Sequence, residues 1–381
     1  MNILDMEADW LALRASLGEM YDERLQPLLE EENEENVSQC MELLLSFGEV
    51  SLCAVLEAKD GEICLRRDLL HQQRWERQII DHVSQEESRW YAQYQKHMFD
   101  DMEFRVLGSV DWSSLSEAQK EMVKRVSLRM NEIPAGSFRM GALSSDDEAE
   151  DDETPRHKVS FRSGMLVGRY VCTQGLYEAV MGENPSEFTD ATRPVENVSW
   201  CDAVLFCNKL SELEGLEPCY ELPEPFENDE EWSKKVRWKK DANGYRLPTE
   251  AEWEYCARAG QKVQYSGSDD MDEVAWHEDN SGRKTHPVGQ KKANGFGLYD
   301  MSGNVYEWGW DTVIGNDEAH FSGESAYTSK SCVDPMVEKE SPKRIVRGGS
   351  WSDFAWFARV SCRFGSVASL RSSDRGFRFN R

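Results

Sequence analysis

Hydrophobic residues in the first third of the chain recur every three to four positions, which is the period of an amphipathic helix. Two apolar stripes follow this period: Val37, Cys40, Met41, Leu44 and Leu45, then Trp75, Ile79, Val83, Trp90 and Tyr94. We expect breaks between helices at Gly48 and at Asp60-Gly61, because glycine interrupts helices readily. The pattern therefore predicts an all-α helical module over residues 1–123.

The pattern changes near Lys124, where alternating apolar and polar positions predict β-strands. Residues 126–133 and 134–141 are expected to pair as a hairpin around Ala135-Gly136. Further strands are expected at 156–161 and 168–171. Between these pairs, residues 146–153 hold seven acidic side chains in eight positions, and because such a run repels itself we expect a solvated loop.

Three helices are expected in the rest of the chain. Thr173 and Thr249 are the expected N-caps of helices over 173–181 and 249–256, and a third helix covers 201–213. The residues expected on their inward faces are Ala203, Phe206, Cys207, Leu210, Trp253 and Cys256. Because many Gly and Trp residues lie outside these elements, we predict an α+β domain over 124–381 with a core closed by loops.

Composition narrows the class of protein. A length of 381 residues suits two domains, since single cores seldom exceed roughly 250–300 residues. The net charge of −27 repels phosphate backbones and anionic lipids, so we expect neither nucleic acid nor a membrane as partner. The N-terminus lacks a secretion-signal pattern and the ten cysteines are scattered, so we expect a cytoplasmic protein with reduced thiols.

The C-terminal segment, residues 346–379, is the most informative stretch. Val346–Trp351 predicts a buried strand that enters a tight glycine turn, and 376–379 predicts a strand that returns close to it. Between them lies a displayed loop of aromatic, small and polar residues, which is a composition typical of recognition surfaces. The alternative is that the aromatic residues belong to the core and the arginines form a solvated face.

Five motifs in order resemble the formylglycine-generating enzyme (sulfatase-modifying factor) family. They are Glu132-Ile-Pro-Ala-Gly-Ser-Phe-Arg-Met-Gly141, Pro194-Val-Glu-Asn-Val-Ser-Trp200, Tyr245-Arg-Leu-Pro-Thr-Glu-Ala-Glu-Trp-Glu-Tyr255, Gly297-Leu-Tyr-Asp-Met-Ser-Gly-Asn-Val-Tyr-Glu-Trp308 and Arg347-Gly-Gly-Ser-Trp351 with Gly376-Phe-Arg378. The resemblance implies a C-type-lectin-like fold over about 125–381. It carries no information on the N-terminal residues.

The resemblance also bears on catalysis. The oxidase members of the family bind copper(I) through two cysteines that follow the Gly-Gly-Ser turn, and soft thiolates suit that metal. The corresponding positions here are about Asp353 and Ala358, and Cys362 is the one cysteine of this segment. We therefore expect neither copper nor oxidase activity.

The end of the chain also resembles the variable proteins of diversity-generating retroelements. Gly348-Gly-Ser-Trp351, Ala358-Arg-Val-Ser361, Arg363 and Gly376-Phe-Arg378 match their variable region, in which side chains at intervening positions differ between copies. Adenine-directed mutation of AAC-type codons cannot produce Glu, Lys, Gln, Met or Trp, and between 352 and 374 only Trp356 belongs to that set. The resemblance implies a segment that presents exchangeable side chains to a ligand.

On this basis we assign residues within the segment. The expected ligand-binding residues are Ser352, Asp353, Phe354, Trp356, Phe357, Cys362, Phe364, Ser366 and Val367. The expected structural residues are Gly348, Gly349, Trp351, Arg359, Arg363, Arg375, Gly376 and Phe377, with the glycines and Trp351 in a strand-turn-strand clamp and the arginines bonded to carbonyls and carboxylates.

Calcium is the one cofactor considered. Relatives that are enzymes hold calcium at a Gly-Asn-x-x-Glu loop, which corresponds to the carbonyls of Ser302, Gly303 and Val305 and the carboxylate of Glu307. The alternative is that Asn304 and Glu307 only form hydrogen bonds within the loop.

The sequence thus predicts a non-catalytic protein that binds a protein ligand through its C-terminal surface, joined to N-terminal helices that contact a second partner. Two alternatives stay open. One is an oxidoreductase similar to formylglycine-generating enzyme that uses Cys362, and the other is a regulatory scaffold in a bacterial defence or protease system whose 146–153 loop contacts a basic partner.

Overall fold

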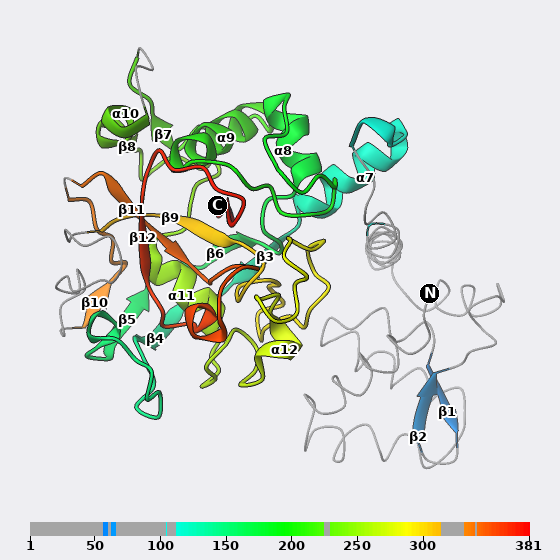
Figure 1. Ribbon diagram of the computed structural model, residues 1–381, viewed down its shortest axis with the longest axis vertical. Helices are drawn as coiled ribbons and strands as arrows, with labels where there is room; N and C mark the ends of the chain where they lie inside the picture. Colours follow the sequence, from blue (N-terminus) through cyan, green and yellow to red (C-terminus); the bar gives the residue numbers. More distant parts are fainter. Residues whose placement is uncertain are drawn as a thin grey trace. The chain divides into compact units, whose positions relative to one another are not determined.

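The computed structural model describes residues 56–59, 62–65, 104, 112–224, 229–313, 331–339 and 341–381. The chain divides into two compact units, residues 1–103 and 104–381 (Figure 1). In the described part of the chain, no helix is long and apolar enough to cross a membrane.

The first unit contains an antiparallel pair of strands, β1 (Leu56–Lys59) and β2 (Glu62–Leu65), with Lys59 opposite Glu62. The prediction of an all-α module is wrong at these residues. The reason is a sequence preference that outweighs the helical pattern here: Asp-Gly, the dipeptide at positions 60 and 61, is favoured as the two-residue connection of a β-hairpin. Both predicted apolar stripes of the N-terminal region lie outside the described residues.

The second unit combines helices and strands, as the sequence predicts. Its helices are α7 (Glu117–Ser127), α8 (Gln174–Met181), α9 (Trp200–Leu213), α10 (Asp229–Lys235), α11 (Glu250–Arg258) and α12 (Met271–Val274), with 3-10 turns η3 (Trp112–Ser114), η4 (Asp151–Glu153) and η5 (Ala355–Ala358). Its strands are β3 (Met130–Ile133), β4 (Gly136–Met140), β5 (His157–Phe161), β6 (Met165–Gly168), β7 (Tyr220–Glu221), β8 (Arg237–Trp238), β9 (Tyr306–Thr312), β10 (Cys332–Val333), β11 (Lys343–Arg347), β12 (Phe364–Val367) and β13 (Arg375–Phe377).

A four-stranded sheet in the order β12-β11-β9-β13 lies at the centre of this unit (Figure 1). β11 runs antiparallel to both β12 and β9, whereas β13 runs parallel to β9. Three of these four strands come from the C-terminal segment or lead directly into it. The fold therefore builds its central sheet from the same residues that carry the predicted recognition loop.

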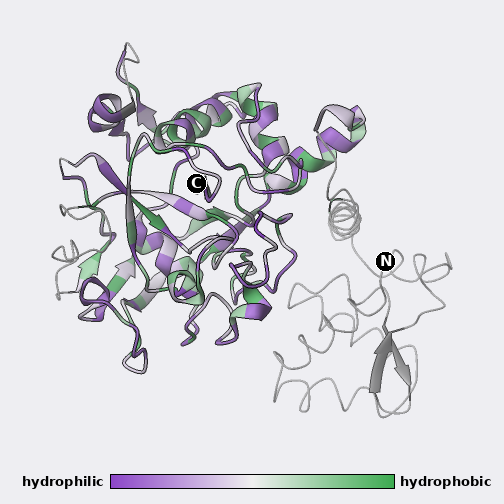
Figure 2. Ribbon diagram, viewed as in Figure 1, coloured by the Kyte–Doolittle hydropathy of each residue, from purple (hydrophilic) through white to green (hydrophobic). Residues whose placement is uncertain are grey.

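Alternation along β9 explains how both faces of this sheet are covered. Tyr306, Trp308 and Trp310 join a core cluster with residues of α8 and α9, helices that carry both hydrophobic and hydrophilic residues (Figure 2). Glu307 and Asp311 point the other way, where they accept hydrogen bonds from residues of α11. Successive side chains of a strand face opposite sides, so α9 and α11 cover opposite faces.

The smaller sheets differ from the expected hairpin. β3 pairs with β6 and β4 pairs with β5, so the two strands on either side of Ala135 do not pair with each other. The predicted strand at 126–133 begins later, because α7 continues to Ser127. A capping box between Ser116 and Gln119 starts α7 and its apolar face is buried, which together favour helix over strand there.

The helix predictions within this unit are confirmed. Thr173 caps α8 and Thr249 caps α11, each by accepting a hydrogen bond from a backbone amide of the first turn. The six predicted inward-facing residues are all buried: Ala203, Phe206, Cys207, Leu210, Trp253 and Cys256. Helical periodicity therefore located these elements well.

Candidate binding surface

The segment begins with the glycine turn that follows β11. Gly348 and Gly349 have φ angles of +96° and +70°, a region that favours glycine. A Cβ at Gly349 would lie 3.0 Å from backbone atoms of Ala358, the last residue of η5. The glycine turn therefore packs closely against the end of η5. The predicted tight turn is confirmed.

The two ends of the segment meet, although not by direct strand pairing. β13 pairs with β9, which lies between it and β11. Contact between the ends is made instead by Trp351, whose indole Nε1 donates to the carbonyl of Ser373 at 2.9 Å. Trp351 also packs edge-on against Phe188, with ring centroids 5.4 Å apart. Trp351 therefore closes the loop between the two ends.

Arginine side chains hold the inner face of the segment. Arg359 donates to Asp146 at 2.7 Å and to both carboxylate oxygens of Glu153 at 2.8 and 2.9 Å. Arg363 makes a two-pronged ion pair with Glu250 of α11 at 2.6 and 2.7 Å. Paired, two-pronged contacts of this kind fix orientation as well as position.

Two further arginines extend these contacts at the segment's ends. Arg347 donates to the backbone carbonyl of Cys362 and, at 2.5 Å, to Glu254 of α11. Arg375 pairs with its neighbour Asp374 at 2.6 Å. The loop between β11 and β13 is thus bonded to α11 and to the 146–153 run along its inner side.

The prediction that residues 146–153 form a solvated loop is wrong for three of the seven acids. The side chains of Asp146, Asp152 and Glu153 turn inward. For Asp146 and Glu153 the reason is that Arg359 is fully buried and its charge needs buried partners, which these two carboxylates supply. The four remaining acids of the run are exposed: Asp147, Glu148, Glu150 and Asp151.

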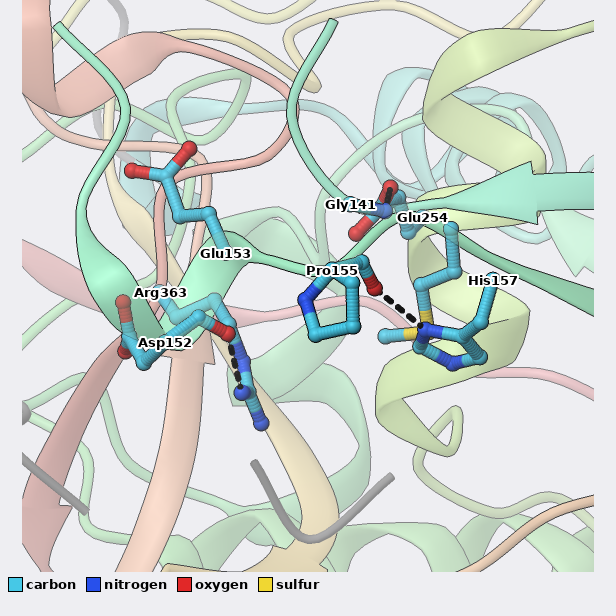
Figure 3. A pocket seen from close by; sticks show the side chains of 8 residues that line it. Gly141, Asp152, Glu153, Pro155, His157, Glu254 and Arg363 are labelled. Atoms are coloured by element: carbon cyan, nitrogen blue, oxygen red, sulfur yellow. Dashed lines mark hydrogen bonds between the residues drawn. The ribbon is translucent and has the colours of Figure 1, made fainter. Parts of the chain in front are cut away.

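A small pocket lies behind the segment, between this acidic run and α11 (Figure 3). Its walls include Asp152, Glu153, Glu254, His157 and Arg363. Most of these groups bond to each other or to neighbours, as the dashed bonds of Arg363 and His157 show. Burial raises the pKa of Asp152 to about 6, with Arg363 opposing and Glu153 and Glu250 reinforcing the shift.

The outer face of the segment carries apolar side chains. Phe354 is 63% exposed and Val367 is 36% exposed, and Ser352, just before Asp353, is also exposed. The predicted contact residues that are half-buried are Asp353, Trp356, Phe357 and Phe364. This part of the segment has one anchored side and one side open to a ligand.

Two predicted contact residues do not lie on this surface. The side chains of Cys362 and Ser366 are buried. Cys362 lies in the arginine-bonded stretch just before β12, and Ser366 lies within β12 between two more exposed neighbours. Strand alternation places Ser366 inward when Val367 points outward, and this correction follows directly from the register.

Tyr306 of β9 lies beneath the segment and contacts it from several directions. Its hydroxyl forms a hydrogen bond with the carboxylate of Asp353, and its backbone amide donates to the carbonyl of Asp374 at 2.8 Å. Its ring lies 5.8 Å from that of Phe364, and the guanidinium of Arg375 lies 5.6 Å from its centroid. Tyr306 therefore contacts the segment at both of its ends and at β12.

The surroundings of Cys362 determine how reactive its thiol is. Burial raises the pKa of the Cys362 thiol to about 12, and Glu153 adds to the effect. A thiol in that state is a weak nucleophile and a poor metal ligand. At the positions of the relatives' paired cysteines, Asp353 bonds to Ser350 and Tyr306, and Ala358 is buried.

The candidate calcium ligands do not fit a calcium ion. One oxygen of Glu307 accepts from Arg378 at 2.8 Å, and the other accepts from Trp253 at 2.8 Å and from Arg378 at 3.1 Å. A guanidinium thus stands beside the carboxylate that the ion would need. Ser302, Gly303 and Val305 are buried in the same loop, where Gly303 donates its amide to Gly348. Across the described residues, no three His, Cys, Asp or Glu side chains are grouped to hold a metal ion.

Sequence reasoning missed four residues that build this site: Asp146, Glu153, Glu250 and Tyr306. A signal for Asp146 and Glu153 was present, because arginines expected to be structural require acidic partners and the 146–153 run supplies them. Glu250 stood within the quoted motif 245–255. Tyr306 stood within a quoted motif but had no spacing that set it apart.

Comparison with known proteins identifies the family. Residues 114–381 match the family described as sulfatase-modifying factor enzyme 1-like domain, and this is well over half of the chain. The chain belongs to this family. The match begins at the end of η3 and includes every element of the candidate surface.

Individual relatives agree with both resemblances seen in the sequence. Chaperone protein LppX of Paenibacillus barcinonensis is 39% identical over 244 residues, which cover 57% of this chain and 79% of that protein. Formylglycine-generating enzyme of Thermomonospora curvata is 28% identical over 285 residues, covering 65% and 91%. The solved structure of Treponema denticola variable protein 1 is similar with a TM-score of 0.57 and 35% identity, covering 66% and 94%.

Proposed function

We propose that this protein is a non-catalytic binding protein with a C-type-lectin-like domain, whose C-terminal segment recognises a protein ligand. Likeness to a variable protein and to a protein named as a chaperone supports a binding role. In this proposal the side chains of the outer face are the exchangeable part, and the inner face is the constant frame.

The proposal rests on one observation, that the segment has one exposed side and one side that is buried and held by ion pairs. On one side Phe354 is largely exposed, and a few residues later Arg359 is fully buried among carboxylates. A loop fixed in this way loses little conformational entropy when a ligand binds. Large rigid aromatic side chains on such a frame are typical anchors of protein interfaces.

The oxidoreductase alternative lacks the chemistry of its relatives at the same place. A carboxylate and a methyl group stand where the resemblance places two thiols. Cys362 is the remaining thiol of the segment, and its raised pKa keeps it protonated at neutral pH. The proposal therefore assigns no reaction to this surface.

Hydrogen–deuterium exchange tests the proposal. Displayed protein fragments are selected on the full chain, and exchange is then measured with and without a recovered fragment. We expect added protection at residues 352–358 and 364–370. Protection confined to other parts of the domain would contradict the assignment of the surface.

A parallel assay tests the alternative. The chain is loaded with copper(I) and incubated with cysteine-containing peptides and oxygen. We expect no peptide oxidation. Oxidation that disappears in Cys362→Ser would replace binding with catalysis as the function of the segment.

A further inference from the structure

Two acidic residues of the segment, Asp353 and Asp374, form hydrogen bonds with Tyr306. Asp353, at the start of the segment, bonds to the hydroxyls of Ser350 and Tyr306. Asp374, at its end, accepts from Arg375 at 2.6 Å. Both acids are half-buried, so a ligand that covers the segment would cover them as well.

The two carboxylates differ in whether a cation neutralises them. Arg375 neutralises Asp374, whereas the partners of Asp353 are hydroxyls, which share its charge without cancelling it. Partial burial and the nearby Asp374 both raise the pKa of Asp353, which shows that its negative charge is disfavoured as it stands. A cation brought by a ligand would relieve both effects.

The neighbouring loop does not supply that cation. Its amide at Glu278 donates to the carbonyl of Asp353, and the charged residues around it are two acids and two bases, all exposed: Glu278, Asp279, Arg283 and Lys284. Among the described residues, neither Arg283 nor Lys284 forms an ion pair with Asp353, and no cation is among the groups that most affect the pKa of Asp353, so its negative charge stays without a positive partner. The chain as a whole has a net charge of −27, which attracts basic partners over a longer range.

Two phenylalanines belong to the same surface as Asp353. Phe354 follows Asp353 directly and is largely exposed, and Phe364 packs on Tyr306, the residue that bonds to Asp353. A surface that offers both a carboxylate and an exposed aromatic ring suits a guanidinium or ammonium group, because a ring attracts the cation and can cover its alkyl stem.

We propose that the surface binds its protein ligand through a basic side chain, arginine or lysine, which pairs with Asp353 against Phe354. This inference rests on the proposed function and adds the chemical class of the partner. It differs from a purely apolar contact, in which Asp353 would only support the loop.

Selection from a random library tests the inference directly. Phage-displayed dodecapeptides are selected on the full chain, on Asp353→Asn and on Glu221→Gln, a control that removes an exposed carboxylate of β7. Melting curves establish that all three proteins are folded. We expect arginine or lysine to be enriched at one peptide position on the wild type and on the control, and not on Asp353→Asn.

Replacing the enriched residue of a selected peptide by glutamine should weaken its binding to the wild type about tenfold and leave its binding to Asp353→Asn nearly unchanged. Selected peptides without a basic residue, or equal enrichment on Asp353→Asn, would overturn the inference and leave the proposed function standing. Failure of any peptide to bind would count against both.

Discussion

Arg359 and Glu153 form a two-pronged ion pair although 206 positions separate them in the sequence. Their side chains are 0% and 1% exposed, and Asp146 adds a second carboxylate to the same guanidinium. The pair joins the C-terminal segment to the acidic run after β4. It explains why Asp146 and Glu153 turn inward and how the loop between β11 and β13 keeps its shape.

Breaking this pair should destabilise the fold strongly. We expect Arg359→Ala to lower the free energy of unfolding by about 3–5 kcal/mol, because it leaves two buried carboxylates without their cation. Arg162→Ala is the matched control: its partner Asp334 is exposed, as is Arg162 itself, so the loss should stay below about 1 kcal/mol. Urea unfolding of both variants measures the difference, and equal losses would refute the anchoring role.

Asp152 should make stability depend on pH. Its pKa is raised to about 6 in the fold, so ionising it costs more free energy in the folded protein than in the unfolded chain, and this cost is complete above about pH 6. Below about pH 4 the carboxyl is protonated both folded and unfolded, and the penalty is absent. We expect Asp152→Asn to gain about 1–2 kcal/mol over the wild type at pH 7.5 and nothing below pH 4. A gain that does not change with pH would show that ionisation is not its cause.

The Cys362 thiol should resist alkylation in the folded protein. It is buried and its pKa is raised to about 12, whereas Cys332 is more exposed. We expect iodoacetamide at pH 8 to modify Cys332 well before Cys362, and denaturation to remove the difference. Peptide mass spectrometry reads each site separately. Rapid modification of Cys362 in the native state would contradict this prediction and would be evidence for a reactive thiol.

Calcium should have no effect on stability. Both oxygens of the Glu307 carboxylate already accept hydrogen bonds from Arg378, so an ion at this place would have to displace a guanidinium. We expect the melting temperature to stay the same after EDTA treatment and after addition of 1 mM or so of calcium. A calcium-dependent rise would mean that Arg378 gives way to the ion.

Sequence patterns predicted those elements whose signal is local. The caps at Thr173 and Thr249 and the glycine turn after β11 were all predicted, because each depends on a few adjacent residues. The hairpin predicted at 126–141 is wrong, because the partners of β3 and β4 are set by packing between distant strands. The pair β1 and β2 differs from the predicted helices, because two four-residue strands are too short for the apolar period to identify.

The binding surface could be predicted in outline only. Phe354 and Val367 lie on the outside as expected, within the stretch of aromatic, small and polar residues whose composition is typical of recognition surfaces. Cys362 and Ser366 were misplaced because composition does not reveal which way each side chain points. Glu153 was misplaced because a run of acids usually faces water, and its buried cation lies two hundred residues away.

Ligand affinity of two single variants tests the central claim most directly. Phe354 and Leu213 are both 63% exposed, but Leu213 lies at the end of α9, outside the segment. With a ligand selected on the wild-type chain, we predict that Phe354→Ala weakens binding at least about tenfold without lowering the melting temperature, while Leu213→Ala binds as the wild type does. Equal affinity of the two variants would contradict a recognition role for the segment.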